Sequence, residues 1–235
     1  MLNVFYITPT TSRSETLLLT LPGNLGLVFG AMLLICFGNL FGHWKWTLVG
    51  SWIGMTVFGG LMALVTPYNK GMMIAFTFLE QTFFGWAQYE SVAFTQLGVH
   101  QHDLGMSGGL AGVARYAGGS LAQAIYVSIL TNTQSARAAA TVPAAAIAAG
   151  LSSENAASLL AAFPLGSAAL QAVPGVVSLM LSLLMLMRVK LTRWQNAEIL
   201  GAAGEAFKWS YAHGLKMTAL ASLSFGGLGL IMCLL

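Results

Sequence analysis

Long apolar runs, each followed by a short polar turn, constrain this chain more than any other feature. Pro22–Phe41 and Thr47–Val65 contain no charged residue. Each run is close to the roughly 20 residues that a helix needs to cross a hydrocarbon core of about 30 Å. The apolar residues are continuous and do not alternate with polar ones, as they would in a membrane barrel. We therefore predict an all-α transmembrane fold.

Composition excludes the other broad classes. Charged residues make up 7% of the 235 residues and hydrophobic residues 57%, whereas soluble domains carry about 25% charged residues. A soluble protein of this size could not cover so much apolar surface, and a disordered chain needs low hydrophobicity. The basic residues are scattered, so we expect membrane lipid and no nucleic acid as surroundings.

Five spans are predicted in all. The other three are Gly71–Leu97, Leu104–Leu130 and Gly214–Leu235. Thr131–Ala172 is rich in Ala but interrupted by polar residues, which indicates a loop outside the bilayer with one or two short amphipathic helices at the interface.

A sixth, doubtful span is Val173–Met187. As a helix it would reach only about 22 Å, short of a core of about 30 Å. Local thinning of the bilayer can absorb such a mismatch. The basic residues Arg188, Lys190 and Arg193 that follow it would favour a cytoplasmic end.

Three ionisable residues lie inside the predicted spans, where each costs at least a few kcal/mol and marks a functional hypothesis. Arg115 lies about 16 Å into its span. Glu80 and Glu90 share the preceding span and lie about 13 Å and about 10 Å from its opposite ends. The two spans form an antiparallel hairpin, so Arg115 is within reach of either carboxylate. Two interpretations stay open: a structural ion pair between helices, or residues that line a cavity or couple transport.

Two helical stripes accompany these charges. Gly108, Gly112 and Gly119 share a face with Arg115, and small residues there let another helix approach closely. Gln81 and Gln88 share a face of the preceding span. They either line a cavity for a bulky, partly polar organic molecule or form hydrogen bonds between helices.

Catalytic and metal-binding patterns are missing from the sequence. His100, His102 and Asp103 lie in one short loop, but a tetrahedral metal site needs more ligands nearby. Nothing resembles a phosphate loop or a nucleophile elbow. We therefore expect no metal, no cofactor and no enzymatic activity.

Two blocks of sequence carry a resemblance to a known family. Gly38–Trp46, with Gly38, Gly42, His43 and Lys45, resembles the degenerate loop motif of a major facilitator half. Asp103–Leu130 closely resembles the penultimate span of fungal fourteen-span efflux pumps, in particular the trichothecene efflux and siderophore-iron transporter family. Phe83–Gly98 is similar to the span that precedes it.

This resemblance implies a function and an orientation. It implies proton-coupled efflux of a small organic molecule, such as a mycotoxin, drug or siderophore, across a fungal plasma membrane. The loops at His43 and Asp103 would be cytoplasmic, residues 131–172 would form an extracellular loop, and Arg115 would lie on a helix that lines the central cavity.

The chain departs from the family in length. Members of the family are more than twice as long, and residues 1–235 would supply only part of the C-terminal half. Alternating access needs two halves that move about a central site. The alternative is therefore a truncated gene fragment that does not transport and acts by association with membrane helices.

The stretch Val177–Gln195 interrupts the resemblance, which resumes at Asn196. Its ends can be encoded by an intron donor (GTAAGT) and an intron acceptor (CAG), so it is either a retained intron or a true short span. We predict that mature message passes from the codon of Val176 to that of Asn196. Sequencing of the spliced transcript checks this, and reads that run unbroken through the codons for Val177–Gln195 would contradict it.

Overall fold

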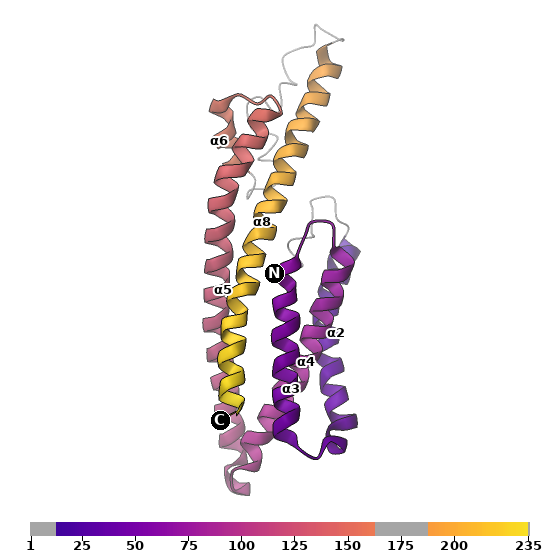
Figure 1. The fold of residues 1–235 in the computed structure, drawn as a ribbon, viewed down its shortest axis with the longest axis vertical. Coiled ribbons are helices and arrows are strands. Elements are labelled where there is room, and N and C mark those ends of the chain that lie inside the picture. The colour runs from indigo at the N-terminus through magenta and orange to yellow at the C-terminus, as the bar shows by residue number, and fades with distance from the viewer. Residues whose placement is uncertain (1–12, 163–187, 235) are drawn as a thin grey trace. The chain divides into compact units, whose positions relative to one another are not determined.

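The computed structural model describes residues 13–162 and 188–234, and every element within them is helical. The α-helices are α2 (Arg13–Phe37), α3 (Trp44–Leu61), α4 (Lys70–Leu97), α5 (Leu104–Ala148), the short α6 (Ser153–Ala162) and α8 (Arg188–Leu234) (Figure 1). Three 3₁₀ segments join them: η1 (Gly38–Phe41), η2 (Met62–Leu64) and η3 (Gln101–Asp103). No strand occurs in these ranges, which confirms the all-α prediction.

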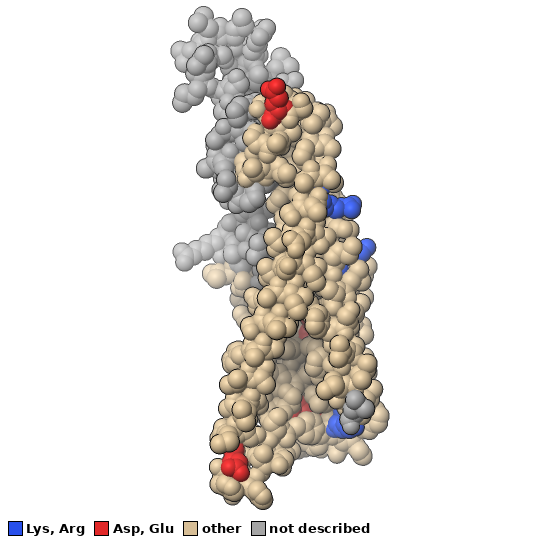
Figure 2. Space-filling view, turned by 90° about the vertical axis from the view of Figure 1, so that its left-hand side faces the viewer, with Lys and Arg blue, Asp and Glu red and all other residues tan. Residues whose placement is uncertain are grey.

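Three of the described segments are long and apolar enough to cross a membrane: Leu17–Phe41, Trp44–Leu64 and Glu198–Leu234. They contain most of the first two predicted spans and of the last one. Helices α4 and α5 are long enough, but their small and polar residues lower the mean hydropathy. Charged side chains occupy few points on the face in Figure 2, with wide uncharged areas between them.

Two helices extend beyond the spans predicted for them. Helix α5 does not end at Leu130 but continues to Ala148, so no separate short helix begins after Thr131. Ala is the strongest helix former, and the helix stops only where Gly150 adopts a positive φ of 102°. In the described part of the predicted loop, residues 131–162, helix α6 is the one short helix. Similarly, the last helix begins at Arg188 rather than near Gly214.

The doubtful span Val173–Met187 lies outside the described residues. Of Val177–Gln195, only residues 188–195 are described, as the first turns of α8. Of the predicted loop 131–172, residues 163–172 are likewise outside the described ranges.

The chain forms two compact units. In the unit made of Ser12–Leu130 and Leu215–Leu235, α4 packs along both α2 and α3. The unit containing Thr131–Gly214 has its own small core, which is built from the second half of α5, α6 and the middle of α8. Its buried members include Ala138, Val142, Ala146, Leu159, Ile199 and Ala203.

Glycines bring α2 and α4 into backbone contact. A Cβ atom on Gly30 would collide with the carbonyl oxygen of Thr82, and one on Gly85 would collide with that of Leu27. Gly26, four residues before Gly30, faces the backbone of α4 in the same way. Small residues at such spacing allow the close helix approach that packs helices in membranes. This stripe was not among the residues predicted to pack helices.

A second set of contacts joins α3 to the last turns of α8. Gly226 and Gly229 of α8 lie against Thr56 and Trp52 of α3. Lys45 Nζ, at the start of α3, donates a hydrogen bond of 2.9 Å to the carbonyl oxygen of Leu234. That carbonyl is one of the groups that a helix end leaves without a partner within the helix.

We predict that Gly30→Ala destabilises the protein, because the added methyl group must displace the backbone of α4. Overpacking of this kind costs about 1–3 kcal/mol, which lowers the midpoint of thermal unfolding in detergent. The matched control is Gly23→Ala on the same helix, since a Cβ at Gly23 meets no atom within 4 Å. Equal melting midpoints for the two variants would contradict the predicted close contact.

Candidate functional site

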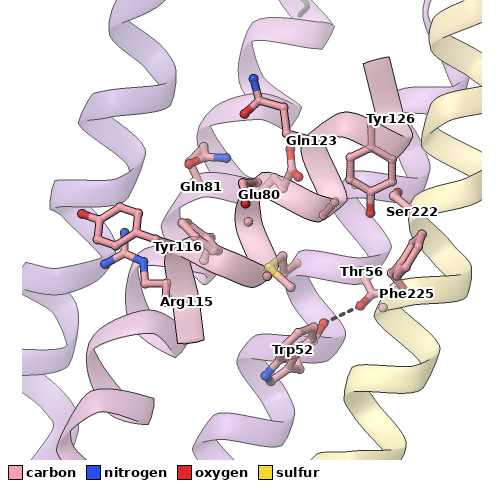
Figure 3. Close-up of a pocket in the computed structure, with 18 of the residues that line it drawn as sticks. Trp52, Thr56, Glu80, Gln81, Arg115, Tyr116, Gln123, Tyr126, Ser222 and Phe225 are labelled. Atoms are coloured by element: carbon pink, nitrogen blue, oxygen red, sulfur yellow. Dashed lines mark hydrogen bonds between the residues drawn. The ribbon is translucent and has the colours of Figure 1, made fainter. Parts of the chain in front are cut away.

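A cavity of about 880 Å³ opens within the first unit, between α3, α4, α5 and the end of α8 (Figure 3). Its wall combines aromatic rings, amides, hydroxyls and two ionisable groups of opposite charge. The principal side chains are Trp52, Thr56, Glu80, Gln81, Phe84, Arg115, Tyr116, Gln123, Tyr126, Ser222 and Phe225.

Glu80 supplies the carboxyl group of this cavity from α4. Its Oε1 lies beside Gly59 of α3, at 3.5 Å from where a Cβ would stand. Ser222 Oγ of α8 lies beside the same glycine, at 3.8 Å from that point. The absence of a side chain at Gly59 therefore makes room for the carboxyl group. Within the described residues, Glu80 has no ion pair.

Arg115 lines the same cavity from α5, with its side chain exposed. Its guanidinium carbon lies 5.4 Å from the centre of the Tyr116 ring. The ion pair with Glu80 or Glu90, one of the two interpretations left open, is not formed among the described residues.

The register of the α4–α5 hairpin explains why this pair is not made. Ser107 Oγ donates a hydrogen bond of 2.7 Å to the carbonyl oxygen of Thr95. Counting from this contact along antiparallel helices places Arg115 near the level of Gln88, about two turns from Glu80. Glu90 lies at nearly the same level as Arg115, but its carboxyl group accepts a hydrogen bond from Thr47 of α3.

Glu90 belongs to a separate, buried cluster. It has no exposed surface and accepts hydrogen bonds from Trp86 Nε1 on its own helix, at 2.9 Å, and from Thr47 Oγ1 on α3. It does not line the cavity that contains Glu80. Glu90 therefore connects α3 to α4.

The predicted polar stripe of α4 is divided in the same way. Gln81 lines the cavity. Gln88 is buried, and its Oε1 has no hydrogen-bond partner in the described structure. The cavity contains instead residues that the sequence analysis did not single out, notably Gln123 and Tyr126. They lie on the same helix face as Gly112 and Gly119. This helical spacing is the sequence signal by which they would have been found.

The glycine stripe of α5 is only partly used for packing. A Cβ atom on Gly108 would lie 3.5 Å from Gln96 Nε2 of α4. Gly112 and Gly119 have no atom within 4 Å of the Cβ position, and Gly119 borders the cavity. Among the described residues, another helix approaches this stripe at Gly108, and the packing role of Gly112 and Gly119 stays a prediction.

The residues of the predicted loop motif have local roles in the structure. Gly42 ends η1 with a positive φ of 50°, which glycine adopts without strain. His43 precedes α3 and Lys45 reaches Leu234. Gly38 is buried. Asp103 Oδ2 lies 3.2 Å from His102 Nε2, and both side chains are exposed. The described residues contain no group of three or more side chains that could hold a metal ion.

Comparison with known proteins gives a consistent result. Residues 1–191 match the family model described as fungal trichothecene efflux pump. The chain is 40% identical over 235 residues to the MFS-type transporter prx5 of Penicillium rubens. It is 26% identical over 165 residues to the trichothecene efflux pump TRI12 of Fusarium sporotrichioides. No solved structure matches.

The coverage of the relatives is unequal. The match includes 100% of this chain but 39% of the Penicillium protein. For the Fusarium protein the shares are 70% and 28%. The chain therefore spans less than two fifths of the length of these relatives.

We predict that Glu90→Leu destabilises the protein more than Glu90→Gln. Leucine leaves the half-buried Trp86 Nε1 without its acceptor, at a cost of about 1–3 kcal/mol, whereas Thr47 Oγ1 keeps the carbonyl oxygen of Trp44 at 2.7 Å. Glutamine keeps one acceptor oxygen. Unfolding by denaturant in detergent measures both. The control is Glu80→Gln, which should leave the midpoint unchanged, and a Glu90→Leu midpoint equal to that of the control would contradict the assignment.

Proposed function

Because the chain belongs to the fungal trichothecene efflux pump family, we propose that it takes part in the export of a small organic molecule, with the Glu80 cavity as part of the substrate path. Its relatives carry the names of transporters, and transport is the function that the apolar helices and the cavity support. The observation that carries the proposal is an acidic side chain in a large cavity, without an ion pair in the described residues.

The chemistry of the cavity fits a bulky, partly polar substrate. Its volume of about 880 Å³ lies within the range of about 300–1,000 Å³ that is typical of small-molecule sites. Trp52, Phe84 and Phe225 offer ring faces, while Gln81 and Gln123 offer amide groups. A mycotoxin, a drug or a siderophore-like molecule has this mixed character. The trichothecenes named for the Fusarium relative are the first candidates.

Glu80 is the proposed coupling residue. An acidic side chain inside a membrane protein is costly and commonly belongs to a proton relay. No fixed cation holds the Glu80 carboxyl group in one charge state, so it can bind a proton in one step of transport and release it in another. Proton exchange at Glu80 would then drive export against a gradient.

Arg115 is proposed to contact the substrate. Its guanidinium group carries five N–H donors and stays charged, and no carboxylate of the described residues pairs with it. Oxygen atoms of a substrate in the cavity would accept these donors. Gln81, on the neighbouring helix, would add a donor and an acceptor to the same wall.

The proposal applies to the chain together with a partner half, because alternating access requires two halves around a central site. We place the transporter in the plasma membrane, with residues 131–172 on the outside. A second hypothesis, helix association without transport, is favoured by one observation: Gly112 leaves open space on α5.

The test is proton-driven export by the full-length protein in reconstituted vesicles, with a radiolabelled trichothecene as the probe. Glu80→Gln should reduce accumulation driven by a pH gradient at least tenfold, because glutamine cannot exchange a proton. Exchange of labelled for unlabelled probe without a pH gradient should persist, since the cavity keeps its shape.

The matched control is Glu154→Gln, which changes an exposed carboxylate in the first turn of α6 and should leave accumulation intact. Normal pH-driven accumulation by Glu80→Gln would contradict the coupling role. Absence of any trichothecene movement in the unaltered protein, with or without a gradient, would contradict the proposed substrate class.

A further inference from the structure

A second cavity, of about 600 Å³, lies in the same unit between α2, η1, α3 and α4. It shares no lining residue with the Glu80 cavity. Aromatic side chains from all four elements surround it: Phe29, Phe41, His43, Trp46, Phe83 and Trp86. Its volume suffices for a drug-sized ligand, and none of the functions proposed above uses it.

The hydroxyl and indole donors of this wall are largely occupied by the protein itself. Thr82 Oγ1 donates to the carbonyl oxygen of Phe78 at 2.8 Å, and Ser51 Oγ donates to that of Leu48 at 2.8 Å. Trp86 Nε1 donates to Glu90 at 2.9 Å, and Thr47 donates to the same carboxyl group. A ligand that enters the cavity therefore meets ring faces rather than unused hydroxyl groups.

The wall carries no Asp, Glu, Lys or Arg, so it offers no counter-charge to an ion. His43, at the turn before α3, is its one ionisable side chain. A charged ligand would lose its hydration here without compensation. A neutral ligand with a single polar group can bury its apolar part against the rings and direct that group to the imidazole.

The rings are held in place by contacts on the protein side. Trp86 is oriented by its bond to the fully buried Glu90. Its ring meets that of Phe41 edge to face, with centres 6.0 Å apart and planes at 76°. Fixed aromatic faces favour flat molecules, because ring stacking stabilises a complex beyond the burial of apolar area.

We propose that this second cavity is a binding site for a neutral, flat polycyclic molecule with one hydrogen-bonding group, separate from the Glu80 cavity. The site includes His43, at the turn before α3, and Trp46 in the first turn of α3. Two of its lining side chains, Phe41 and Trp46, are exposed, so the cavity opens to the outside of this unit.

The probe for the test is 1-hydroxypyrene, which is neutral and flat and has one hydroxyl group. Its fluorescence anisotropy is followed as purified protein in lipid nanodiscs is added. Gly50→Leu should weaken binding at least tenfold, because a Cβ at Gly50 meets no atom within 4 Å and the larger side chain would fill the cavity that Gly50 lines. Leu79→Trp fills it from α4 and should act in the same way.

Two controls make the same change elsewhere. Gly119→Leu fills the Glu80 cavity, and Gly23→Leu lies on α2 and lines neither cavity. Both should bind the probe as the unaltered protein does. Anionic 1-pyrenesulfonate should bind at least tenfold more weakly than 1-hydroxypyrene.

Three results would overturn the proposal. The first is unchanged binding in both Gly50→Leu and Leu79→Trp. The second is equal binding of the anionic probe. The third is displacement of 1-hydroxypyrene by brominated phospholipid at the lipid content of a membrane, which would show an acyl-chain groove instead. None of these results depends on transport, so failure here leaves the proposed export function standing.

Discussion

Backbone contact between α2 and α4 is the constraint on which the first unit depends. Gly26, Gly30 and Gly85 remove the side chains that would hold these helices apart. In a membrane, apolar surface alone gives little reason for helices to associate, so close backbone packing has to supply the attraction. With α4 held against α2, its other faces are free to meet α3 and to present Glu80 and Gln81 to a cavity.

The two acids of α4 illustrate how position on a helix decides chemistry. Glu90 is enclosed and bonded to Trp86 and Thr47, which suits a connection between helices. Glu80 lies beside Gly59 in a cavity, which suits a group that changes its partner during a cycle. Both residues looked alike as carboxylates inside predicted spans. Only the environment of each distinguishes a fixed bond from a candidate for proton exchange.

The ion pair that was one of two interpretations of Arg115 is not formed in the described structure, for a definable reason. Depth along the hairpin placed Arg115 within reach of both carboxylates, but depth ignores the direction in which a side chain leaves its helix. Glu90 is bonded on the side of α3, and Glu80 is about two turns away from Arg115 along the hairpin. Arg115 and Glu80 consequently share one cavity without an ion pair, and this arrangement leaves both available to a ligand.

The sequence by itself determined the fold class, most helix positions and the family, because long uncharged runs and short motifs are properties of local stretches. Of the five residues that it suggested for a cavity or for coupling, the structure brings Glu80, Gln81 and Arg115 to one cavity. The sequence did not determine the length of α5, where Ala-rich sequence continues the helix to Ala148, nor the separation of Glu90 and Gln88 from that cavity. Tertiary structure alone decided these assignments and the aromatic cavity around Trp86, since they depend on which helix faces meet across long separations in the chain.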